Sequence, residues 1–170
     1  MKAADLMTRD PACVTPTDSA RDAARRMEEW DCGLVPVVDD LDARHVLGVI
    51  TDRDLALRVL ADGRPADVTV GEIMTLAPDC VTPDADVELV EHLMADRQVR
   101  RVVVIDGDGR AVGVISQADL ARASRDVPSE VSQFDVAQTL ERISEPDVYA
   151  RAVDSHGESA GEAADRAQVR

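Results

Sequence analysis

Two stretches of sequence decide the fold. Residues 47–55 read LGVITDRDL, and residues 112–120 read VGVISQADL. Each has a glycine, two aliphatic residues, a hydroxyl residue and, three positions later, an aspartate. Residues 13–16 (CVTP) also recur at 80–83. The offset is 67 at this earlier pair (80 minus 13) and 65 at the later one (112 minus 47). The chain therefore contains two copies of one unit, the first with two extra loop residues.

Composition favours a folded, soluble protein and disfavours nucleic acid as a partner. Hydrophobic residues make up 45% of the 170 residues and charged residues 31%, as in globular proteins. The formal net charge of -15 would repel phosphate over most of the surface. The aromatic residues, Trp30, Phe134 and Tyr149, are too few to form a platform on which bases stack.

The sequence also predicts the compartment and the state of the thiols. Its longest aliphatic run, residues 102–105, is far shorter than the ~18 residues of a membrane span, so we expect a cytoplasmic protein without membrane contact. The three cysteines are too few and wrongly spaced for a disulfide framework, so they are expected to be reduced core residues. These are Cys13, Cys32 and Cys80.

A metal site is not expected, because the histidines lack the spacing of metal ligands. These are His45, His92 and His156. A thiol or metal sensor that uses Cys13 and Cys32 with a histidine stays an alternative. No catalytic triad or dyad is evident, so the protein is not expected to be an enzyme.

Hydrophobic spacing predicts the same elements in each copy. Residues 20, 23, 24 and 27, and the matching 87, 90 and 94, form the apolar stripe of a helix. The apolar runs 34–38 and 102–105 suit strands that are buried on both faces. Turn residues lead from each run to a second strand ending in Gly-Val-Ile, and a further helix begins at Asp52 or Gln117.

These elements predict an α/β fold. We expect two pseudo-symmetric repeats, each a small three-stranded sheet with two flanking helices, packed sheet against sheet because one unit alone buries too little. The expected boundaries are repeat 1 at 3–60, a linker at 61–69, repeat 2 at 70–123, a possible extra helix within 124–154, and a disordered acidic tail at 155–170.

The tandem motifs over residues 3–123 resemble paired cystathionine-β-synthase (CBS) domains, also called a Bateman module. The resemblance implies a regulatory, non-enzymatic module that holds AMP, ADP, ATP or another adenosyl ligand in the cleft between the repeats and signals to a partner protein. It also implies a homodimer formed through helices. Apolar stripe edges around Met27, Met94 and Leu55 would supply a physical motive for dimerisation.

The resemblance also implies which residues contact the ligand. Asp54 and Asp119 would bind the ribose hydroxyls, and Thr51 and Ser116 would lie near ribose or phosphate. Apart from the resemblance, a chain with a net charge of -15 needs local cations to bind an anionic nucleotide, and Arg53, Arg100 and Arg101 are the candidates because arginine matches phosphate oxygens. The adenine would meet backbone and aliphatic groups of the first two strands of each repeat: Val14, Thr15, Pro16, Leu34, Val35 and Pro36, then Val81, Thr82, Pro83, Arg101, Val102 and Val103.

Other interpretations of these residues stay open. A carboxylate can accept two hydrogen bonds from a vicinal diol, but Thr51-x-x-Asp54 and Ser116-x-x-Asp119 also fit a helix-capping box. The arginines could be solvated or paired with the many acids. The two sites should differ, because Arg100 replaces Gly33 and Val103 replaces Pro36 in the second copy. A structural or stress-related interaction protein with vestigial clefts is the main rival function.

Overall fold

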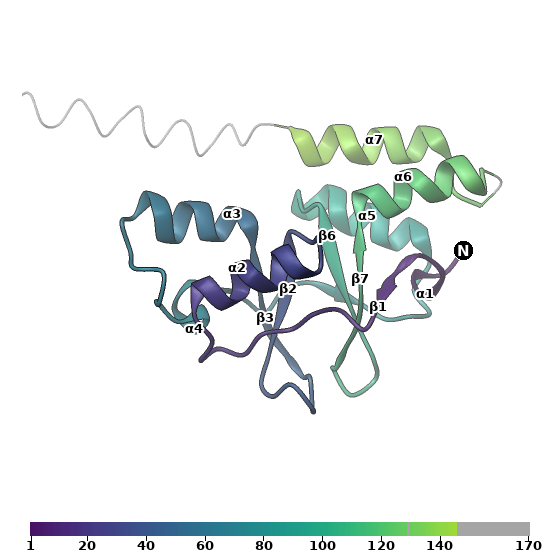
Figure 1. The fold of residues 1–170 in the computed structure, drawn as a ribbon. Helices are drawn as coiled ribbons and strands as arrows, with labels where there is room; N and C mark the ends of the chain where they lie inside the picture. The colour runs from purple at the N-terminus through teal and green to yellow at the C-terminus, as the bar shows by residue number, and fades with distance from the viewer. Residues whose placement is uncertain (129, 146–170) are drawn as a thin grey trace, which may run out of the picture.

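A computed structural model describes residues 1–128 and 130–145 (Figure 1). Its elements are α1 (Ala3–Leu6), β1 (Thr8–Arg9), α2 (Ala20–Glu29), β2 (Leu34–Val38), β3 (Val46–Thr51), α3 (Asp52–Leu55), the π-helix η1 (Ala56–Ala61), α4 (Val70–Ile73), β4 (Thr75–Leu76), β5 (Cys80–Val81), α5 (Val87–Arg97), β6 (Arg101–Ile105), β7 (Ala111–Ser116), α6 (Gln117–Asp126) and α7 (Gln133–Ser144). The helix η1 continues α3 without a break, so the two form one helical segment.

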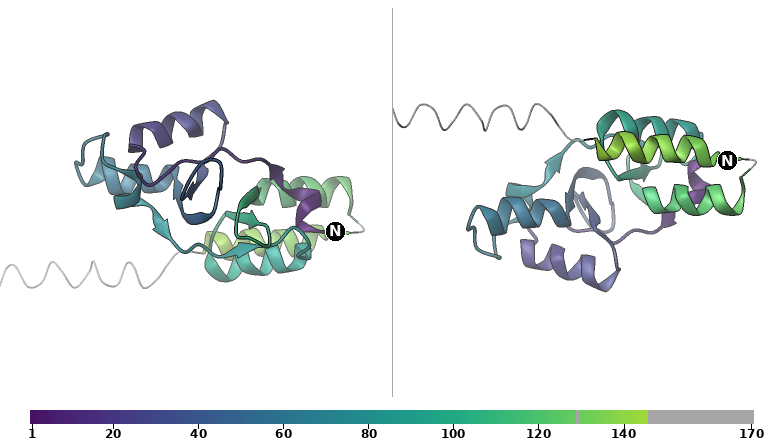
Figure 2. Two further views of the ribbon diagram at one scale, coloured as in Figure 1. Left: turned by 90° about the horizontal axis from the view of Figure 1, so that it is seen from below. Right: turned by 90° about the horizontal axis from the view of Figure 1, so that it is seen from above.

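The strands form two sheets, which confirms the predicted α/β fold of two repeats. One sheet has the order β2-β3-β4 and the other β1-β7-β6-β5. Each is built on an antiparallel hairpin, in which Leu34 lies opposite Thr51 and Arg101 lies opposite Ser116. Seen from below and from above, the two halves lie side by side with their helices on the outside (Figure 2).

The repeats exchange their first strands. The strand β1 of repeat 1 pairs with β7 of repeat 2, and β4 of repeat 2 pairs with β3 of repeat 1. Three strands were predicted in each sheet, but the second sheet has four because β1 joins its edge. The position equivalent to β5 in repeat 1 is an isolated bridge between Val14 and Val37, so the first sheet keeps three named strands.

Three groups of buried side chains hold these elements together. Two fill the space between each sheet and its helices, and the exchange appears there too: Ala3 of α1 lies in the core of repeat 2, and Ile73 of α4 in that of repeat 1. The third group lies between the two sheets and includes Leu34, Val49 and Val103. Burial of these apolar side chains is the driving force that joins the two repeats.

The helices follow the predicted stripes, with one correction. In α2 the buried residues are Ala20, Ala23 and Met27. Met27 and Met94 are only 7% and 0% exposed, so neither methionine itself lies at an exposed apolar edge, whereas Leu55 is partly buried. These methionines are core residues because they lie at the centre of their stripes and face the sheet.

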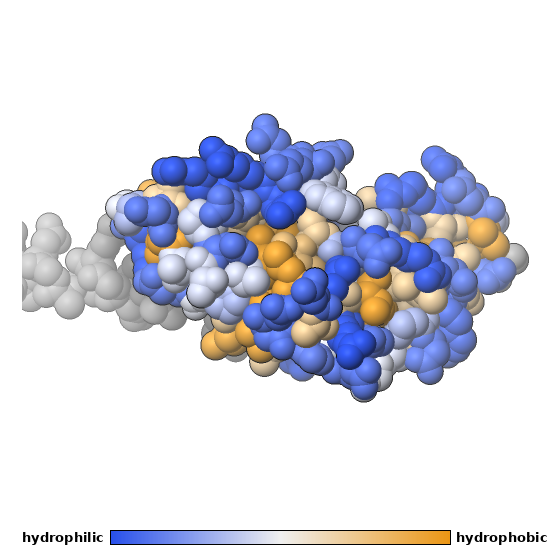
Figure 3. All heavy atoms as spheres, turned by 60° about the horizontal axis from the view of Figure 1, so that its bottom comes forward, coloured by the Kyte–Doolittle hydropathy of each residue, from blue (hydrophilic) through white to orange (hydrophobic). Residues whose placement is uncertain are grey.

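The segment after the second repeat contains α7, which packs against α5 and α6. The tail at 155–170, predicted to be disordered, lies outside the described residues. Among the described helices, none combines the length and apolar character needed to cross a membrane. The face of the molecule in Figure 3 is mainly hydrophilic, with small apolar patches between charged side chains.

Candidate functional site

The two repeated aspartates lie in the first turns of α3 and α6, where they cap the helices. The backbone N–H and the hydroxyl of Thr51 donate to Asp54 Oδ2 at 2.9 and 2.7 Å, and the backbone N–H of Asp54 donates back to Thr51 Oγ1 at 3.1 Å. Ser116 and Asp119 repeat these contacts at 2.7, 2.6 and 3.3 Å. Each pair is a complete capping box, so the capping interpretation is confirmed for both.

The second carboxylate oxygen of each aspartate meets an arginine. Asp54 Oδ1 lies 3.3 Å from Arg58 Nη2, and Asp119 Oδ1 is paired with Arg122. Sequence reasoning missed both arginines, although their spacing of four and three residues from the aspartate was a usable signal. The Arg122 side chain is 60% exposed, so a ligand could displace it at small cost. Arg58 is 43% exposed but also donates to the Ile73 carbonyl at 2.6 Å and to the Thr75 hydroxyl at 3.2 Å, so it is less free to move.

Backbone pairing brings the predicted residues of each repeat into one strip. In repeat 1, the Val14 N–H donates to the Pro36 carbonyl at 3.1 Å, and Leu34 lies opposite Thr51. In repeat 2, Val81 lies beside Val104 of β6, and Arg101 lies opposite Ser116. Each strip therefore runs from the Thr-Pro turn across two strands to the aspartate at the start of the following helix.

Many side chains in these strips are buried and face a core. Val35 and Val102 are 0% and 1% exposed and pack toward the helices of their own repeat. Leu34 and Val103 face the group of side chains between the sheets. The side chains of Val14, Val81 and Pro36 are also buried. A ligand could meet such residues mainly through their backbone atoms.

The two Thr-Pro turns are fixed by equivalent contacts. The Pro16 carbonyl accepts from the Gly71 N–H, and the Pro83 carbonyl accepts from the Ala4 N–H, both at 2.9 Å. The Thr15 hydroxyl donates to Asp18 at 3.1 Å, and the Thr82 hydroxyl donates to Asp84 at 2.5 Å. Each threonine hydroxyl is thus already occupied by an acid of its own turn.

The three predicted cationic residues differ in their settings. Arg53 and Arg100 are exposed, and neither forms an ion pair with a described residue. Arg101 extends from repeat 2 to repeat 1, where its Nη1 donates to the Gly33 carbonyl at 3.4 Å. A Cβ at Gly33 would lie 2.7 Å from Arg101 Nη2 and 2.5 Å from Asp52 Oδ2. The glycine therefore leaves room for the Arg101 guanidinium to reach the backbone of repeat 1.

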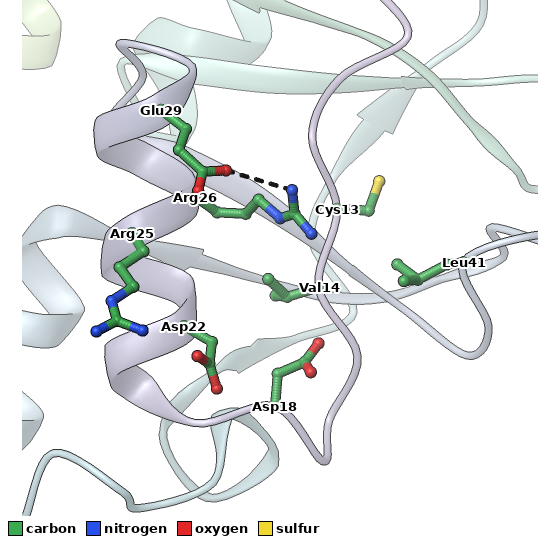
Figure 4. A pocket seen from close by; sticks show the side chains of 8 residues that line it. All are labelled: Cys13, Val14, Asp18, Asp22, Arg25, Arg26, Glu29 and Leu41. Atoms are coloured by element: carbon green, nitrogen blue, oxygen red, sulfur yellow. Dashed lines mark hydrogen bonds and ion pairs between the residues drawn. The ribbon is translucent and has the colours of Figure 1, made fainter.

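One pocket lies beside the strip of repeat 1 rather than between the repeats (Figure 4). Its volume is about 300 Å³, and α2 forms one wall with both acids and arginines, including the Arg26–Glu29 ion pair at 3.4 Å. The lining residues are Cys13, Val14, Asp18, Asp22, Arg25, Arg26, Glu29 and Leu41. Among them only Val14 was a predicted site residue, so this pocket does not match the predicted cleft.

Burial raises the pKa of all three thiols above the usual value of a cysteine. The Cys13 and Cys80 thiols each donate to a proline carbonyl two residues earlier, at 3.4 Å. Arg44, 3.5 Å from Cys13 Sγ, opposes this rise in the pKa of Cys13 without cancelling it. A raised pKa reduces the thiolate that redox chemistry and metal binding require. Within the described residues, no three His, Cys, Asp or Glu side chains are grouped to hold a metal ion.

Comparison with known proteins finds the same paired architecture. The family model for the CBS domain matches twice, at residues 3–61 and 70–126. The chain is 36% identical over 146 residues to the uncharacterized protein YlbB of Bacillus subtilis, which covers 86% of this chain and 93% of the relative. It is also 36% identical over 121 residues to Hypoxic response protein 1 of Mycobacterium tuberculosis, covering 71% of this chain and 82% of that protein.

Solved structures with similar folds carry different ligands. Hypoxic Response Protein I, with two coordinated zinc ions, is 35% identical with a TM-score of 0.64, over 72% of this chain and 98% of that one. A Pyrobaculum aerophilum CBS domain protein complexed with AMP is 25% identical with a TM-score of 0.69, over 78% and 98%. The CBS domain pair of protein MJ0100, with 5′-methylthioadenosine and S-adenosyl-L-methionine, is 25% identical with a TM-score of 0.68, over 74% and 97%.

Proposed function

Because the chain belongs to the CBS-domain family, we propose that it is a regulatory pair that binds an adenosyl ligand and passes the signal to a partner protein. The ligand class is AMP, ADP, ATP or a related adenosyl compound. The observation that carries this proposal is the strip of backbone and side chains in each repeat, which ends on a carboxylate at the start of a helix. Similar pairs hold AMP, or 5′-methylthioadenosine and S-adenosyl-L-methionine, which supports the ligand class.

In the proposed complex, the ribose hydroxyls donate to Oδ1 of Asp54 or Asp119 after the paired arginine moves aside. The capping contacts at Oδ2 stay in place, so binding leaves the helix intact. In repeat 1, the exposed Arg53 side chain binds the phosphate. Repeat 2 has Ala118 at the equivalent position and relies on Arg100 or on Arg101 from the strand. The two sites are therefore expected to have unequal affinities for a charged nucleotide.

A calorimetric titration of the purified protein against AMP, ADP, ATP, S-adenosylmethionine and 5′-methylthioadenosine tests this function. We expect saturable binding of at least one of them, with weaker binding in high salt for the phosphate-bearing ligands because exposed arginines are screened. A protein that binds none of the panel, at concentrations that saturate a related CBS pair, would support the rival function of an interaction protein with vestigial clefts.

We also propose that two copies associate through the helical face of repeat 1. Leu57 and Leu60 of η1 are 49% and 79% exposed there, whereas α7 packs over the corresponding helices α5 and α6 of repeat 2. Light scattering should therefore give about twice the chain mass of 18.3 kDa. Leu60→Asp should shift the protein toward monomer, because a charge would enter an apolar contact.

The matched control for this change is Leu89→Asp, at a residue 54% exposed on α5 of repeat 2. It places the same charge on an exposed leucine outside the proposed interface and should leave the mass unchanged. A wild-type protein that stays monomeric at micromolar concentration contradicts the proposal. The proposal is also contradicted if Leu60→Asp and Leu89→Asp dissociate the dimer to the same extent.

A further inference from the structure

A second pocket lies between α5 and α7, and none of its lining residues belongs to the predicted nucleotide strip of repeat 2. Its volume is about 230 Å³. Exposed side chains of both helices form the rim, among them Glu88, His92, Asp135 and Arg142. The floor includes Glu91 and Thr139, which are 7% and 6% exposed. The pocket thus combines an acidic, solvent-facing rim with a buried carboxyl group at its base.

The Glu91 carboxyl is incompletely satisfied. Its Oε1 is buried and has no hydrogen-bond partner among the described residues. Buried polar atoms are normally paired, so such an oxygen in a pocket points to a donor that comes from outside the chain. Burial raises the pKa of Glu91 above its usual value; the carboxylates of Asp135 and Glu88 raise it further, and His92 opposes them.

The nearby arginine does not supply the missing donor. Arg142 lines the pocket, but its Nη2 is 2.6 Å from Asp96 Oδ1, and its backbone carbonyl accepts from Gln98. The ion pair with Asp96 directs the guanidinium to a partner outside the pocket lining. The acidic groups of the pocket therefore outnumber its cations.

We propose that this pocket binds the primary ammonium group of a small aliphatic amine. An ammonium group carries three donors and a positive charge, which match the buried Glu91 oxygen and the rim carboxylates of Glu88 and Asp135. A pocket of about 230 Å³ has room for the short hydrocarbon chain of such an amine. An organic cation fits better than a metal ion, because no three metal-ligating side chains are grouped among the described residues.

Amine binding should depend on pH through Glu91. The titratable groups that line the pocket with it are Glu88 and His92 of α5, and Asp135 and Arg142 of α7; Glu88, Asp135 and His92 act on its pKa, and Arg142 is paired with Asp96. The folded protein holds the Glu91 proton more tightly than the unfolded chain does. Protonated Glu91 therefore contributes fully to stability below the pKa of the unfolded state, and this contribution is lost as the pH rises through the pKa of the folded state. A bound ammonium offsets that loss, so the affinity for the amine increases as Glu91 ionises.

Calorimetric titration of the full chain with putrescine at constant ionic strength tests the site. We expect saturable binding that strengthens as the pH rises above the usual range of a glutamate and Glu91 loses its proton. Glu91→Gln should weaken it by about ten-fold or more and remove the pH dependence, because the amide cannot carry the charge. The matched control is Glu141→Gln, which makes the same charge change at an exposed position of α7 and should bind as the wild type does.

The analogue of putrescine with three methyl groups on each nitrogen separates a built site from simple charge attraction, since it carries the same two positive charges but no N–H donor. We expect it to bind far more weakly than putrescine. The proposal is overturned if putrescine does not bind saturably, if Glu91→Gln binds it as tightly as the wild type, or if the permethylated dication binds equally well. Any of these results would mean that the acidic surface attracts cations without a specific acceptor.

Discussion

Replacing Gly48 by alanine should destabilise the protein by about 2–3 kcal/mol, more than the same change at its counterpart Gly113, which should cost about 1 kcal/mol. A Cβ at Gly48 would lie 2.6 Å from the backbone carbonyl oxygen of Thr75. That carbonyl belongs to β4, which is held against β3 by the pairing of Val49 with Thr75. The backbone cannot retreat without disturbing the exchanged strand, so the clash is not relieved by a side-chain rotation.

At Gly113 the same Cβ would meet the side chain of Met7, at 2.5 Å from Sδ and 2.9 Å from Cβ. Methionine is flexible, and part of this contact can be relieved by a change of rotamer. The two glycines occupy equivalent places in the repeats, so the comparison isolates the effect of the neighbouring atoms that a Cβ would meet at each position. The expected difference follows from a rigid neighbour in one repeat and a mobile one in the other.

Urea unfolding monitored by circular dichroism measures both free energies of unfolding. Gly107→Ala serves as the control, because a Cβ there would meet nothing within 4 Å, and its cost should stay within about 0.5 kcal/mol. Equal losses for Gly48→Ala and Gly113→Ala would show that the neighbours adjust equally well. A loss at Gly48 no larger than the control would mean that β4 is not held tightly against β3.

Local sequence signals predicted the parts of the fold that depend on neighbouring residues. The hydroxyl and aspartate at the start of α3 and α6 predicted where these helices begin, because a capping box is formed within four residues. The continuous apolar runs correctly predicted strands buried on both faces. The change of repeat offset correctly placed the longer loop in the hairpin of repeat 1.

The exchange of β1 and β4 could not be predicted in this way. Each strand has only two residues, too few to show a period, and its partner lies in the other repeat. The choice of partner is a long-range packing result. The recurring glycines at 48 and 113 held a clue, because they mark a close approach of another backbone or side chain, but they do not say which segment approaches.

The candidate site was predicted at the level of the strip but not of each side chain. Strand residues alternate between faces, so Val35 and Val102 face the helices while Leu34 and Val103 face the other repeat. That alternation could have separated them in advance. The pairing of Asp54 with Arg58 was harder to foresee, because the many charged residues offer several partners at helical spacing.

Changing both Asp54 and Asp119 to asparagine should weaken adenosyl-ligand binding by about ten-fold to a hundred-fold while leaving the fold intact. In each capping box, Oδ2 accepts from a backbone N–H and a hydroxyl, and the asparagine carbonyl oxygen can take over that position. The amide NH2 then replaces Oδ1, so the ribose diol meets a donor where the carboxylate offered an acceptor. The fold loses the favourable charge at each helix N-terminus, about 0.3–1 kcal/mol at each site, and the ion pairs with the exposed Arg58 and Arg122, which contribute less than about 1 kcal/mol each.

Substitution of the arginines paired with these aspartates provides a second test of where the ligand binds. Arg58→Ala combined with Arg122→Ala frees Oδ1 of both carboxylates, so it should leave the affinity unchanged or raise it. Calorimetry on the parent and both double variants, with unfolding curves for each, separates ligand contact from capping. If the asparagine variant binds every adenosyl ligand as the parent does, or loses several kcal/mol of stability, the aspartates act as structural caps alone. Opposite effects of the two double variants on affinity would instead place the ligand at Oδ1, because removal of a competing cation and removal of the acceptor change the same contact in opposite directions.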